Sequence, residues 1–458
     1  MTATGTNTRR GRGRPEEPQA GATEAGSPGF LRGYVRALGP GLVTGASDDD
    51  PSGIATYAQA GSSFGFSFLW TALLTFPLMA TVQEICDRTA LATGRGLGEL
   101  ATERLGGKAR TVVIGLVGLL IVANALNVAA DLVAVGSGMH LLHAGPTAVW
   151  SVVAGLAISA FLLTGSFEVV ARVFKLLCLA LLGYIAMLFI VRVNWGSVAR
   201  GTFLPDVSVG SSYVALLVAI LGTTISPYLF FWQSMHRVEE MRDEPEGGSE
   251  PERLSDRGDV AARKKQSRSR FDVFSGMAFS NIVMFSIIVA TAATLGSHGK
   301  HNIQSAAEAA GALKPVAGRF ASTLFALGFI GAGVLAIPVL AGSGSAGMAG
   351  LLGKPTGFSR SLKRAPTFYG LVMVGTLGGA ALSLLGVNPI RLLVVVAVIN
   401  GVAAAPFLVL VMMISSDRNI MGDYVNGKAA RLLGWGTTAL MTAAAIILFG
   451  FAHGGGLY

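Results

Sequence analysis

The chain has 458 residues, of which 52% are hydrophobic and only 13% are charged. Soluble proteins carry about 25% charged residues, so this composition excludes an ordinary soluble domain and predicts a polytopic membrane protein. The formal net charge is +9, and because the basic residues lie mostly between apolar runs, that charge needs no nucleic-acid partner. Two cysteines are too few for a disulfide framework.

The first 35 residues (1–35) are polar and rich in Gly, Arg and Glu, and they predict a disordered tail with no signal peptide. Beyond them, eleven apolar runs are long enough to cross the ~30 Å hydrocarbon core, which takes about 20 helical residues. The runs are 37–60, 66–86, 111–138, 147–164, 169–191, 211–234, 273–296, 320–350, 367–386, 390–414 and 432–452.

The basic residues predict the orientation of these spans. If the N-terminus is cytoplasmic, the inner segments contain 29 of the 35 Lys and Arg residues. The positive-inside rule then favours a protein of the plasma (inner) membrane with its N-terminus in the cytoplasm and its C-terminus outside. The longest inner segment, 236–270, is acidic and then basic, which predicts a disordered or partly helical linker whose basic half lies near anionic headgroups.

The first span is interrupted by the sequence S-D-D-D-P-S-G-I. Pro51 cannot donate a backbone hydrogen bond and disfavours helix at Asp50, and Gly53 loosens the following turn. A carboxylate at the centre of a membrane helix costs about 2.5–3.5 kcal/mol on insertion scales, so Asp50 needs a cation, a proton or a donor. Asp48 and Asp49 are expected to line a water-filled entrance.

The sixth span has a similar interruption, L-G-T-T-I-S-P-Y, which contains Thr223 and Ser226. A single break often means only a kink, because Pro and Gly are common in membrane helices. Two breaks five spans apart, in oppositely oriented spans, instead favour an inverted repeat whose broken helices meet at a substrate site. The predicted parts are a first repeat over 36–195, a second over 211–414 with cytoplasmic loop 236–270, and an eleventh span with the C-terminus over 430–458.

Other polar residues within spans have structural and functional interpretations. In the third span, Asn124, Asn127 and Asp131 share one helix face, which either joins helices by hydrogen bonds or lines an ion or proton route. Glu84 is expected to pair with Arg88 one turn away. The remaining candidate, Asn281, is expected to be a packing amide. The six histidines form no metal-binding motif.

Four motifs occur in order along the chain: G-P-G-L-V-T-G-A-S-D-D-D-P-S-G with A-T-Y-A-Q-A-G, G-T-T-I-S-P, F-D-V-F-S-G-M-A-F-S-N and S-S-D-R-N-I-M-G-D-Y-V-N-G. From about residue 36 onward, the chain resembles the Nramp divalent-metal transporters. The resemblance implies an all-α membrane protein of about eleven helices, built as a five-plus-five inverted repeat with broken helices one and six and working by alternating access.

The resemblance also implies the site residues. Asp50 would be the charged metal ligand, and oxygens near Gly53, Thr223 and Ser226 would contact the ion directly or through water. Asn400 falls where typical members have a glutamine that helps to enclose the ion, so it is a secondary candidate. Typical members have D-P-G-N in span one, and the asparagine corresponds here to Gly53.

Span six also departs from the family. Typical members have A-x-x-M-P-H there, and the methionine and histidine correspond to Ser226 and Tyr228. Thioethers favour softer transition metals, whereas oxygen ligands suit Mg²⁺, Ca²⁺ and Mn²⁺, and Mg²⁺ usually keeps several waters. The pattern resembles the Nramp-related magnesium transporters. Typical members carry a second acid on their proton pathway, and this chain has Ala134 at the corresponding position. Proton coupling is therefore expected to be weak or absent.

The sequence therefore predicts a divalent-cation importer for partly hydrated Mg²⁺, with Mn²⁺ as a lesser substrate, driven mainly by the membrane potential. Its expected partners are these ions and the lipid bilayer; no resident cofactor is expected, and the oligomeric state stays open. The alternatives are a proton-coupled Mn²⁺ or Fe²⁺ transporter and an ion-coupled carrier of a small organic solute on the same fold. An enzyme is not expected, because no nucleophile–base or metal-ligand constellation occurs.

Overall fold

Helices and turns make up the part of the chain that the computed structural model describes, and this part contains no strand. The expected tail, 1–35, lies outside the described residues. Contacts divide the chain after Ala37, and only the second unit is considered below. The described residues are 39–164, 167–208, 210–244, 250–296, 303, 320–385 and 389–453.

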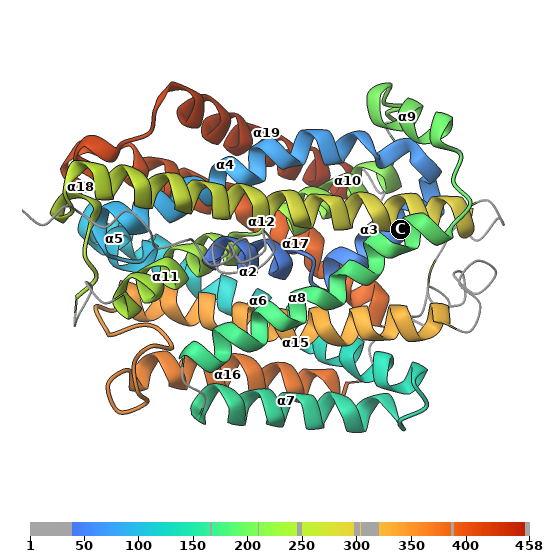
Figure 1. Ribbon diagram of the computed structural model, residues 1–458, viewed down its shortest axis with the longest axis horizontal. Coiled ribbons are helices and arrows are strands. Elements are labelled where there is room, and N and C mark those ends of the chain that lie inside the picture. The colour runs from blue at the N-terminus through green and yellow to red at the C-terminus, as the bar shows by residue number, and fades with distance from the viewer. Residues whose placement is uncertain are drawn as a thin grey trace, which may run out of the picture. The chain divides into compact units, whose positions relative to one another are not determined.

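The helices follow the apolar runs closely (Figure 1). In the first half they are α2 (Pro40–Asp48), α3 (Pro51–Phe64), η1 (Gly65–Phe68), α4 (Trp70–Thr93), α5 (Leu97–Arg104), α6 (Gly107–Leu141), α7 (Thr147–Thr164), α8 (Phe167–Ile190) and α9 (Trp195–Phe203). In the second half they are α10 (Ser211–Thr224), α11 (Pro227–Asp243), η2 (Leu254–Asp256), α12 (Asp259–Thr294), α15 (Phe320–Leu351), α16 (Pro366–Ser383), α17 (Pro389–Ser415), α18 (Arg418–Met421), η4 (Gly422–Tyr424) and α19 (Lys428–His453).

The lengths and compositions of these helices confirm a helical integral membrane protein. Seven helices of the described chain are long and apolar enough to cross a membrane, or up to nine if each of two bent pairs is one span. One bent pair joins Pro51–Phe68 to Trp70–Thr93 at 109°. The first two expected spans therefore contribute a single bent pair to this count. Because α16 is not counted either, the total of eleven spans stays a prediction.

Both predicted helix breaks are present. The first helix ends at Asp48, Asp50 has extended backbone with φ −64° and ψ 168°, and α3 begins at Pro51. The second break has the same form, because Ser226 is extended with φ −80° and ψ 132° and Pro227 begins α11. Proline suits the first helical position, where its missing N–H is not needed. The two interruptions therefore follow directly from the local sequence.

Glycines let the broken helices approach their neighbours closely. A Cβ atom built on Gly276 of α12 would collide with the backbone carbonyl of Gly41 in α2. In the second half, a Cβ on Gly401 of α17 would lie 2.8 Å from the carbonyl oxygen of Val218 in α10. Small residues at such crossings allow backbone-to-backbone contact within the membrane. Each broken helix is thus held against an unbroken one.

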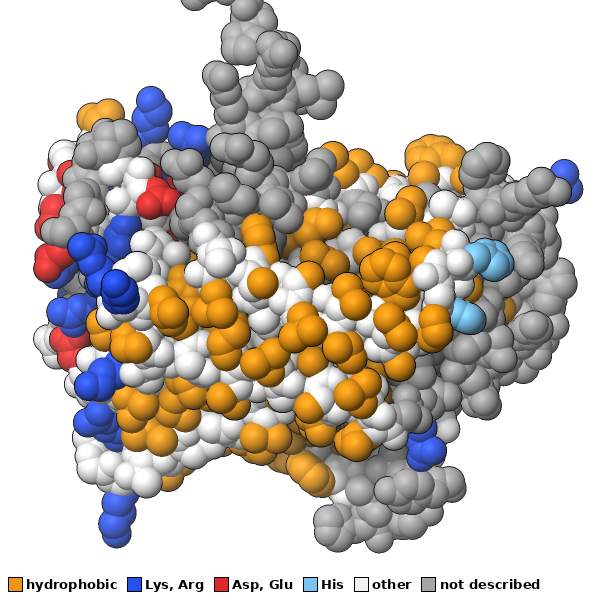
Figure 2. All heavy atoms as spheres, turned by 90° about the horizontal axis from the view of Figure 1, so that it is seen from below, with side chains coloured by type: hydrophobic (Ala, Val, Ile, Leu, Met, Phe, Trp, Pro, Cys, Tyr) orange, Lys and Arg blue, Asp and Glu red, His pale blue; other side chains and the backbone are white. Residues whose placement is uncertain are grey.

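Charged side chains concentrate at one end of the helices. Figure 2 shows most of the visible Lys, Arg, Asp and Glu side chains at the end where α5 and α18 lie in Figure 1, and hydrophobic side chains over the rest of the visible face. Several helix residues on the surface are large and apolar, including Leu119, Leu156 and Val374, which are 59%, 56% and 64% exposed. This distribution matches an apolar belt bordered by a charged interface.

Candidate functional site

Asp50 caps the N-terminus of α3 at the first helix break. Its Oδ1 accepts hydrogen bonds from the backbone N–H of Gly53 at 2.7 Å and from the Ser52 hydroxyl at 2.6 Å. The side chain is 1% exposed. The exposed N–H groups and the dipole of α3 both favour a negative group at this position. Pro51, which breaks the span, thus also places Asp50 at the helix cap and so determines where the Asp50 carboxylate points.

The second broken helix contributes a hydroxyl to Asp50. The Tyr228 O–H points to Oδ2 of Asp50 at 3.3 Å and to the carbonyl oxygen of Ser47 at 3.2 Å. This contact was not predicted from the sequence, in which Tyr228 was considered only as the replacement of a histidine. The S-P-Y sequence could have suggested it, because Tyr228 lies in the first turn of α11 and side chains at a helix start point towards the preceding break.

Gly53 and Thr223 bring the two breaks into contact. A Cβ atom on Gly53 would lie 3.0 Å from Oγ1 of Thr223 and 3.2 Å from the carbonyl oxygen of Asp48. The Thr223 hydroxyl is buried and has no hydrogen-bond partner. The structure therefore places these two predicted residues together, and it leaves no space for a larger side chain at position 53.

Ser226 lies at the second break, but its hydroxyl is already engaged. It reaches the carbonyl oxygens of Gly222 at 2.7 Å and Thr223 at 2.9 Å. These carbonyls belong to the last turn of α10, where helical partners are missing. The oxygen lone pairs of the hydroxyl remain free to accept, whereas its proton is used in capping α10.

Asn400 lies in α17 and is fully buried, with both polar side-chain atoms unpartnered. The next residue, Gly401, packs against Gly222 of α10. Asn400 therefore belongs to the helix that supports the second break, although no hydrogen bond joins its side chain to the other predicted site residues in the described chain.

The structure does not support a water-filled entrance at Asp48 and Asp49, because both are 0% exposed. Asp48 accepts a hydrogen bond from the Ser280 hydroxyl at 2.8 Å through Oδ2, and its Oδ1 has no partner. Neither oxygen of Asp49 has one. The expectation was wrong in this closed arrangement because α12 and neighbouring helices cover the break. These acids are part of the buried site.

The polar stripe of α6 joins two helices at Asn124, and its role in an ion or proton route stays a prediction. Asn124 donates to the carbonyl oxygen of Leu340 at 2.8 Å, which joins α6 to α15. One and two turns further along, Asn127 and Asp131 are fully buried, and neither has a hydrogen-bond partner. The carboxyl of Asp131 lies close enough to Asp50 for their charges to interact.

We use the name break site for Asp48, Asp49, Asp50, Thr223, Ser226, Asn400, Asn127 and Asp131.

Two structural expectations are confirmed outside the break site. Arg88 forms an ion pair with Glu84 at 3.1 Å. Asn281 donates to Thr75 Oγ1 at 3.2 Å, which joins α12 to α4. No group of three or more His, Cys, Asp or Glu side chains arranged to hold a metal occurs among the residues the structure describes.

A buried ion-pair network, which was not predicted from the sequence, joins α4, α11 and α12. Arg237 of α11 contacts Asp87 at 2.6 Å, Asp272 at 3.1 Å and Glu240 at 2.8 Å, and its side chain is 3% exposed. Gln233 also donates to Asp87 at 2.6 Å. Periodicity could not reveal this cluster, because its members come from three separate helices. We call Asp87, Gln233, Arg237 and Asp272 the Arg237 network.

Asp272 extends this network to the start of α2. Its carboxylate oxygens accept hydrogen bonds from the backbone N–H groups of Gly39 at 2.7 Å and Gly41 at 2.8 Å. The first N–H groups of a helix lack partners within it, so Asp272 serves as a cap supplied by α12. The network therefore holds together α2 and α11, one segment of each broken helix, on the side away from α3 and α10.

Comparison with solved structures shows the same fold. A manganese transporter of Eremococcus coleocola, solved with an aromatic bis-isothiourea compound, is 17% identical, with a TM-score of 0.70 over 92% of this chain and 88% of that one. A nucleobase-cation-symport-1 family transporter, solved in a closed conformation with bromovinylhydantoin bound, is 14% identical, with a TM-score of 0.55 over 90% and 93%. At these identities the likeness establishes fold alone.

The sequence gives a more specific result. Residues 41–450 match the profile of the family described as natural resistance-associated macrophage protein-like, or Nramp. The match includes both helix breaks, α6, the Arg237 network and α17. The chain therefore belongs to the Nramp family.

Proposed function

We propose that this protein imports divalent metal cations by alternating access, with partly hydrated Mg²⁺ as the main substrate and Mn²⁺ as a lesser one. Asp50 is the charged ligand, and oxygens at or near Gly53, Thr223 and Ser226 complete the site, with Asn400 as a secondary contributor. The observation that carries the proposal is the concentration of unpaired acceptors around Asp50, where both broken helices meet.

Charge supports a cation as the substrate. Asp48, Asp49, Asp50 and Asp131 are each at most 1% exposed, and no ion pair to any of them occurs in the described part of the chain. An unpaired buried charge is costly, and a cation or a proton relieves that cost. A carrier of an organic carboxylate would have the opposite requirement. The fold alone does not decide this, because related folds carry different substrates.

Ligand type supports Mg²⁺ over a softer metal. The position that carries methionine in typical family members is Ser226, whose hydroxyl contacts the end of α10. The groups around Asp50 are hydroxyls, carboxylates, amides and backbone carbonyls. Oxygen ligands suit Mg²⁺ and Mn²⁺, and a site with few charged ligands suits an ion that retains water.

The membrane potential is the proposed driving force. A doubly charged cation that enters a compartment held at ~100 mV, inside negative, gains about 4.6 kcal/mol, twice the value for one elementary charge. That free energy corresponds to an accumulation of about a thousandfold. Weak proton coupling is proposed because Ala134 and Tyr228 replace the acid and the histidine of the family pattern.

Uptake into proteoliposomes tests the proposal. Vesicles containing a Mg²⁺-sensitive dye and a pH-sensitive dye would be assayed with and without an imposed negative potential. We expect Mg²⁺ entry that follows the potential, leaves the internal pH unchanged and disappears in Asp50→Ala. Glu103→Ala is the matched control, because it removes a carboxylate that is 52% exposed and lies outside the break site.

A proton-coupled Mn²⁺ or Fe²⁺ transporter is the second candidate function. Asp131 favours it, because a fully buried carboxyl without a donor, close to Asp50, is suited to hold a proton. Mn²⁺ entry with acidification, together with loss of the acidification alone in Asp131→Asn, would support this candidate. No Mg²⁺ uptake under any potential would exclude the main proposal.

A further inference from the structure

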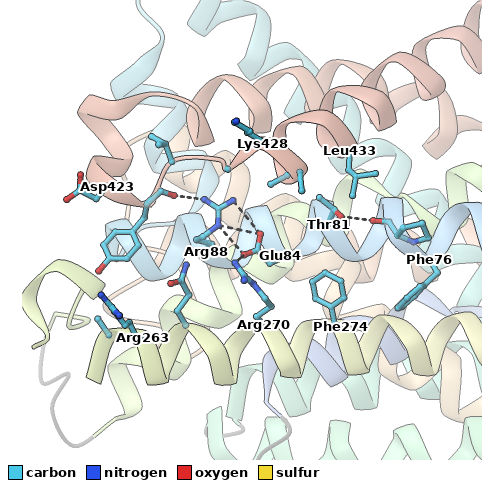
Figure 3. A pocket seen from close by; sticks show the side chains of 18 of the residues that line it. Phe76, Thr81, Glu84, Arg88, Arg263, Arg270, Phe274, Asp423, Lys428 and Leu433 are labelled. Atoms are coloured by element: carbon cyan, nitrogen blue, oxygen red, sulfur yellow. Dashed lines mark hydrogen bonds and ion pairs between the residues drawn. The ribbon is translucent and has the colours of Figure 1, made fainter. Parts of the chain in front are cut away.

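A cavity separate from the break site opens between α4, α12, α19 and the segment that precedes α19. Its volume is about 780 Å³. Figure 3 shows Phe76, Phe274 and Leu433 along one part of its wall, and Arg263 near the opposite end. Nothing in the proposed transport mechanism uses this cavity.

The two ends of the cavity differ in chemistry. Its apolar end is lined by Phe76 and Pro77 of α4, Phe274 of α12 and Leu433 of α19. Its other end lies among charged side chains at the charged end of the helices. The neighbouring surfaces of α4 and α19 are apolar, with Leu73 and Leu432 52% and 76% exposed. The cavity therefore crosses the border between an apolar belt and an interface, which is where a phospholipid lies.

The charges at the polar end leave positive charge unmatched. Glu84 contacts both Arg88 and Arg270, each at 3.1 Å, so two cations share one carboxylate. Arg263 and Lys428 line the cavity and are exposed, and neither has an ion-pair partner among the described residues.

Arg88 is committed to the protein, because it also donates to the carbonyl oxygen of Tyr424 and, at 2.8 Å, to Asn426. Arg270 remains available, since its side chain is 57% exposed.

Two acids also line the cavity. Asp259 is in the first turn of α12, and Asp423 projects away from the Glu84 cluster in Figure 3. Neither forms an ion pair with Arg263, Arg270 or Lys428 in the described chain. Arg263, Arg270 and Lys428 therefore offer the cavity cationic side chains whose charge is not fully matched, on either side of the Arg88–Glu84 pair.

We infer that this cavity binds one anionic phospholipid, with its headgroup phosphate among Arg263, Arg270 and Lys428 and its acyl chains along Phe76, Phe274 and Leu433. Basic pockets between membrane helices recognise anionic headgroups in this way. A free phosphate would not use the apolar half. The tail 1–35 is a poor occupant, because it carries five Arg and three Glu and is itself basic.

Lipid binding to the intact protein in detergent tests the inference. Native mass spectrometry would compare phosphatidylglycerol with phosphatidylcholine of the same acyl chains, and thermal melting would be followed with each lipid. We expect tighter binding of phosphatidylglycerol and a melting temperature that only this lipid raises. The double variant Arg263→Ala/Lys428→Ala should bind phosphatidylglycerol about thirtyfold more weakly, since each basic residue contributes several-fold near an anionic headgroup.

The matched control is Lys264→Ala/Lys354→Ala, which removes two exposed cations that do not line the cavity. It should bind phosphatidylglycerol like the unaltered protein. A second variant, Ala429→Trp, obstructs the cavity without changing charge and should also weaken binding. Equal binding of the two lipids, equal losses in both double variants, or full competition by inorganic phosphate would each overturn the inference.

Discussion

The Arg237 network and the break site are both buried and both include residues at α11, yet their acids are paired very differently. In the network, Asp87 and Asp272 share Arg237 and accept further hydrogen bonds from Gln233 and from the start of α2. In the break site, Asp49 and Asp131 have no ion-pair partner among the described residues, and neither oxygen of Asp131 accepts a hydrogen bond there.

Burial costs a charge several kcal/mol unless it is paired. The network keeps its buried aspartates paired with Arg237, whereas the acids of the break site form no ion pair in the described chain. The two regions therefore differ in how their buried acids are paired, although all of these acids are aspartates in or beside membrane helices.

The largest expected effect comes from breaking the network. Arg237→Ala leaves Asp87 and Asp272 buried without their cation, and we expect a loss of about 3–5 kcal/mol of stability. Thermal melting of the purified protein would show it. Arg95→Ala is the control, because its pair with Glu103 is about half exposed and such pairs contribute about 0–1 kcal/mol. Similar losses in both variants would mean that the network is not specially stabilising.

A smaller loss should follow from separating α2 from α12. In Gly276→Ala the new methyl group meets the backbone of Gly41, so the helices must move apart and the hydrogen bonds from α2 to Asp272 weaken. Overpacking of this kind costs about 1–3 kcal/mol. Gly370→Ala is the control, since nothing lies within 4 Å of a Cβ there. An unchanged melting temperature in Gly276→Ala would contradict the close helix contact.

In the break site, a substitution should raise the stability of the protein instead of lowering it. Asp131→Asn removes a buried charge that has no partner, and we expect the metal-free protein to gain about 0.5–2 kcal/mol of stability, as is common when a functional group is replaced. Asp272→Asn is the matched substitution in the network and should lower stability, because its carboxylate accepts from Gly39, Gly41 and Arg237. If both variants shifted the melting temperature in the same direction, the contrast between the regions would fail.

The smallest effect should come from Tyr228→Phe. It removes the hydroxyl that contacts Asp50 at 3.3 Å, and one hydrogen bond contributes about 0.5–1.5 kcal/mol. We expect a slightly lower melting temperature and Mg²⁺ uptake with an affinity changed less than tenfold. Loss of uptake as complete as in Asp50→Ala would instead place the Tyr228 hydroxyl among the ion ligands.

Local sequence was sufficient for several features. Pro51 and Pro227, each with neighbouring polar residues and glycine, predicted both helix breaks, because proline lacks a backbone donor and disfavours helix at the residue before it. Proline alone was not sufficient, since Pro77, Pro338 and Pro406 lie inside continuous helices. The pair Glu84–Arg88 was predictable from its i, i+4 spacing. The placement of Gly53 beside Thr223 followed from the family resemblance. The other contacts within the break site did not follow from local sequence.

Features that join distant segments were not predictable. The Arg237 network links residues separated by 35 and 150 positions, and the lipid cavity draws on three helices. Burial of Asp48 and Asp49 was also missed, because exposure depends on which helices cover a break and not on the break itself.

The sequence by itself determined that this is a helical membrane protein of the Nramp type, with two broken helices and an aspartate at the first break. Those properties depend on hydropathy and proline chemistry, which act within a single helix, and on the order of motifs along the chain. Only the tertiary structure decided which buried acids are paired. Pairing depends on the side chains that neighbouring helices present. For Asp87 and Asp272 these include Arg237, whereas Asp49 and Asp131 have no cationic partner in the described chain.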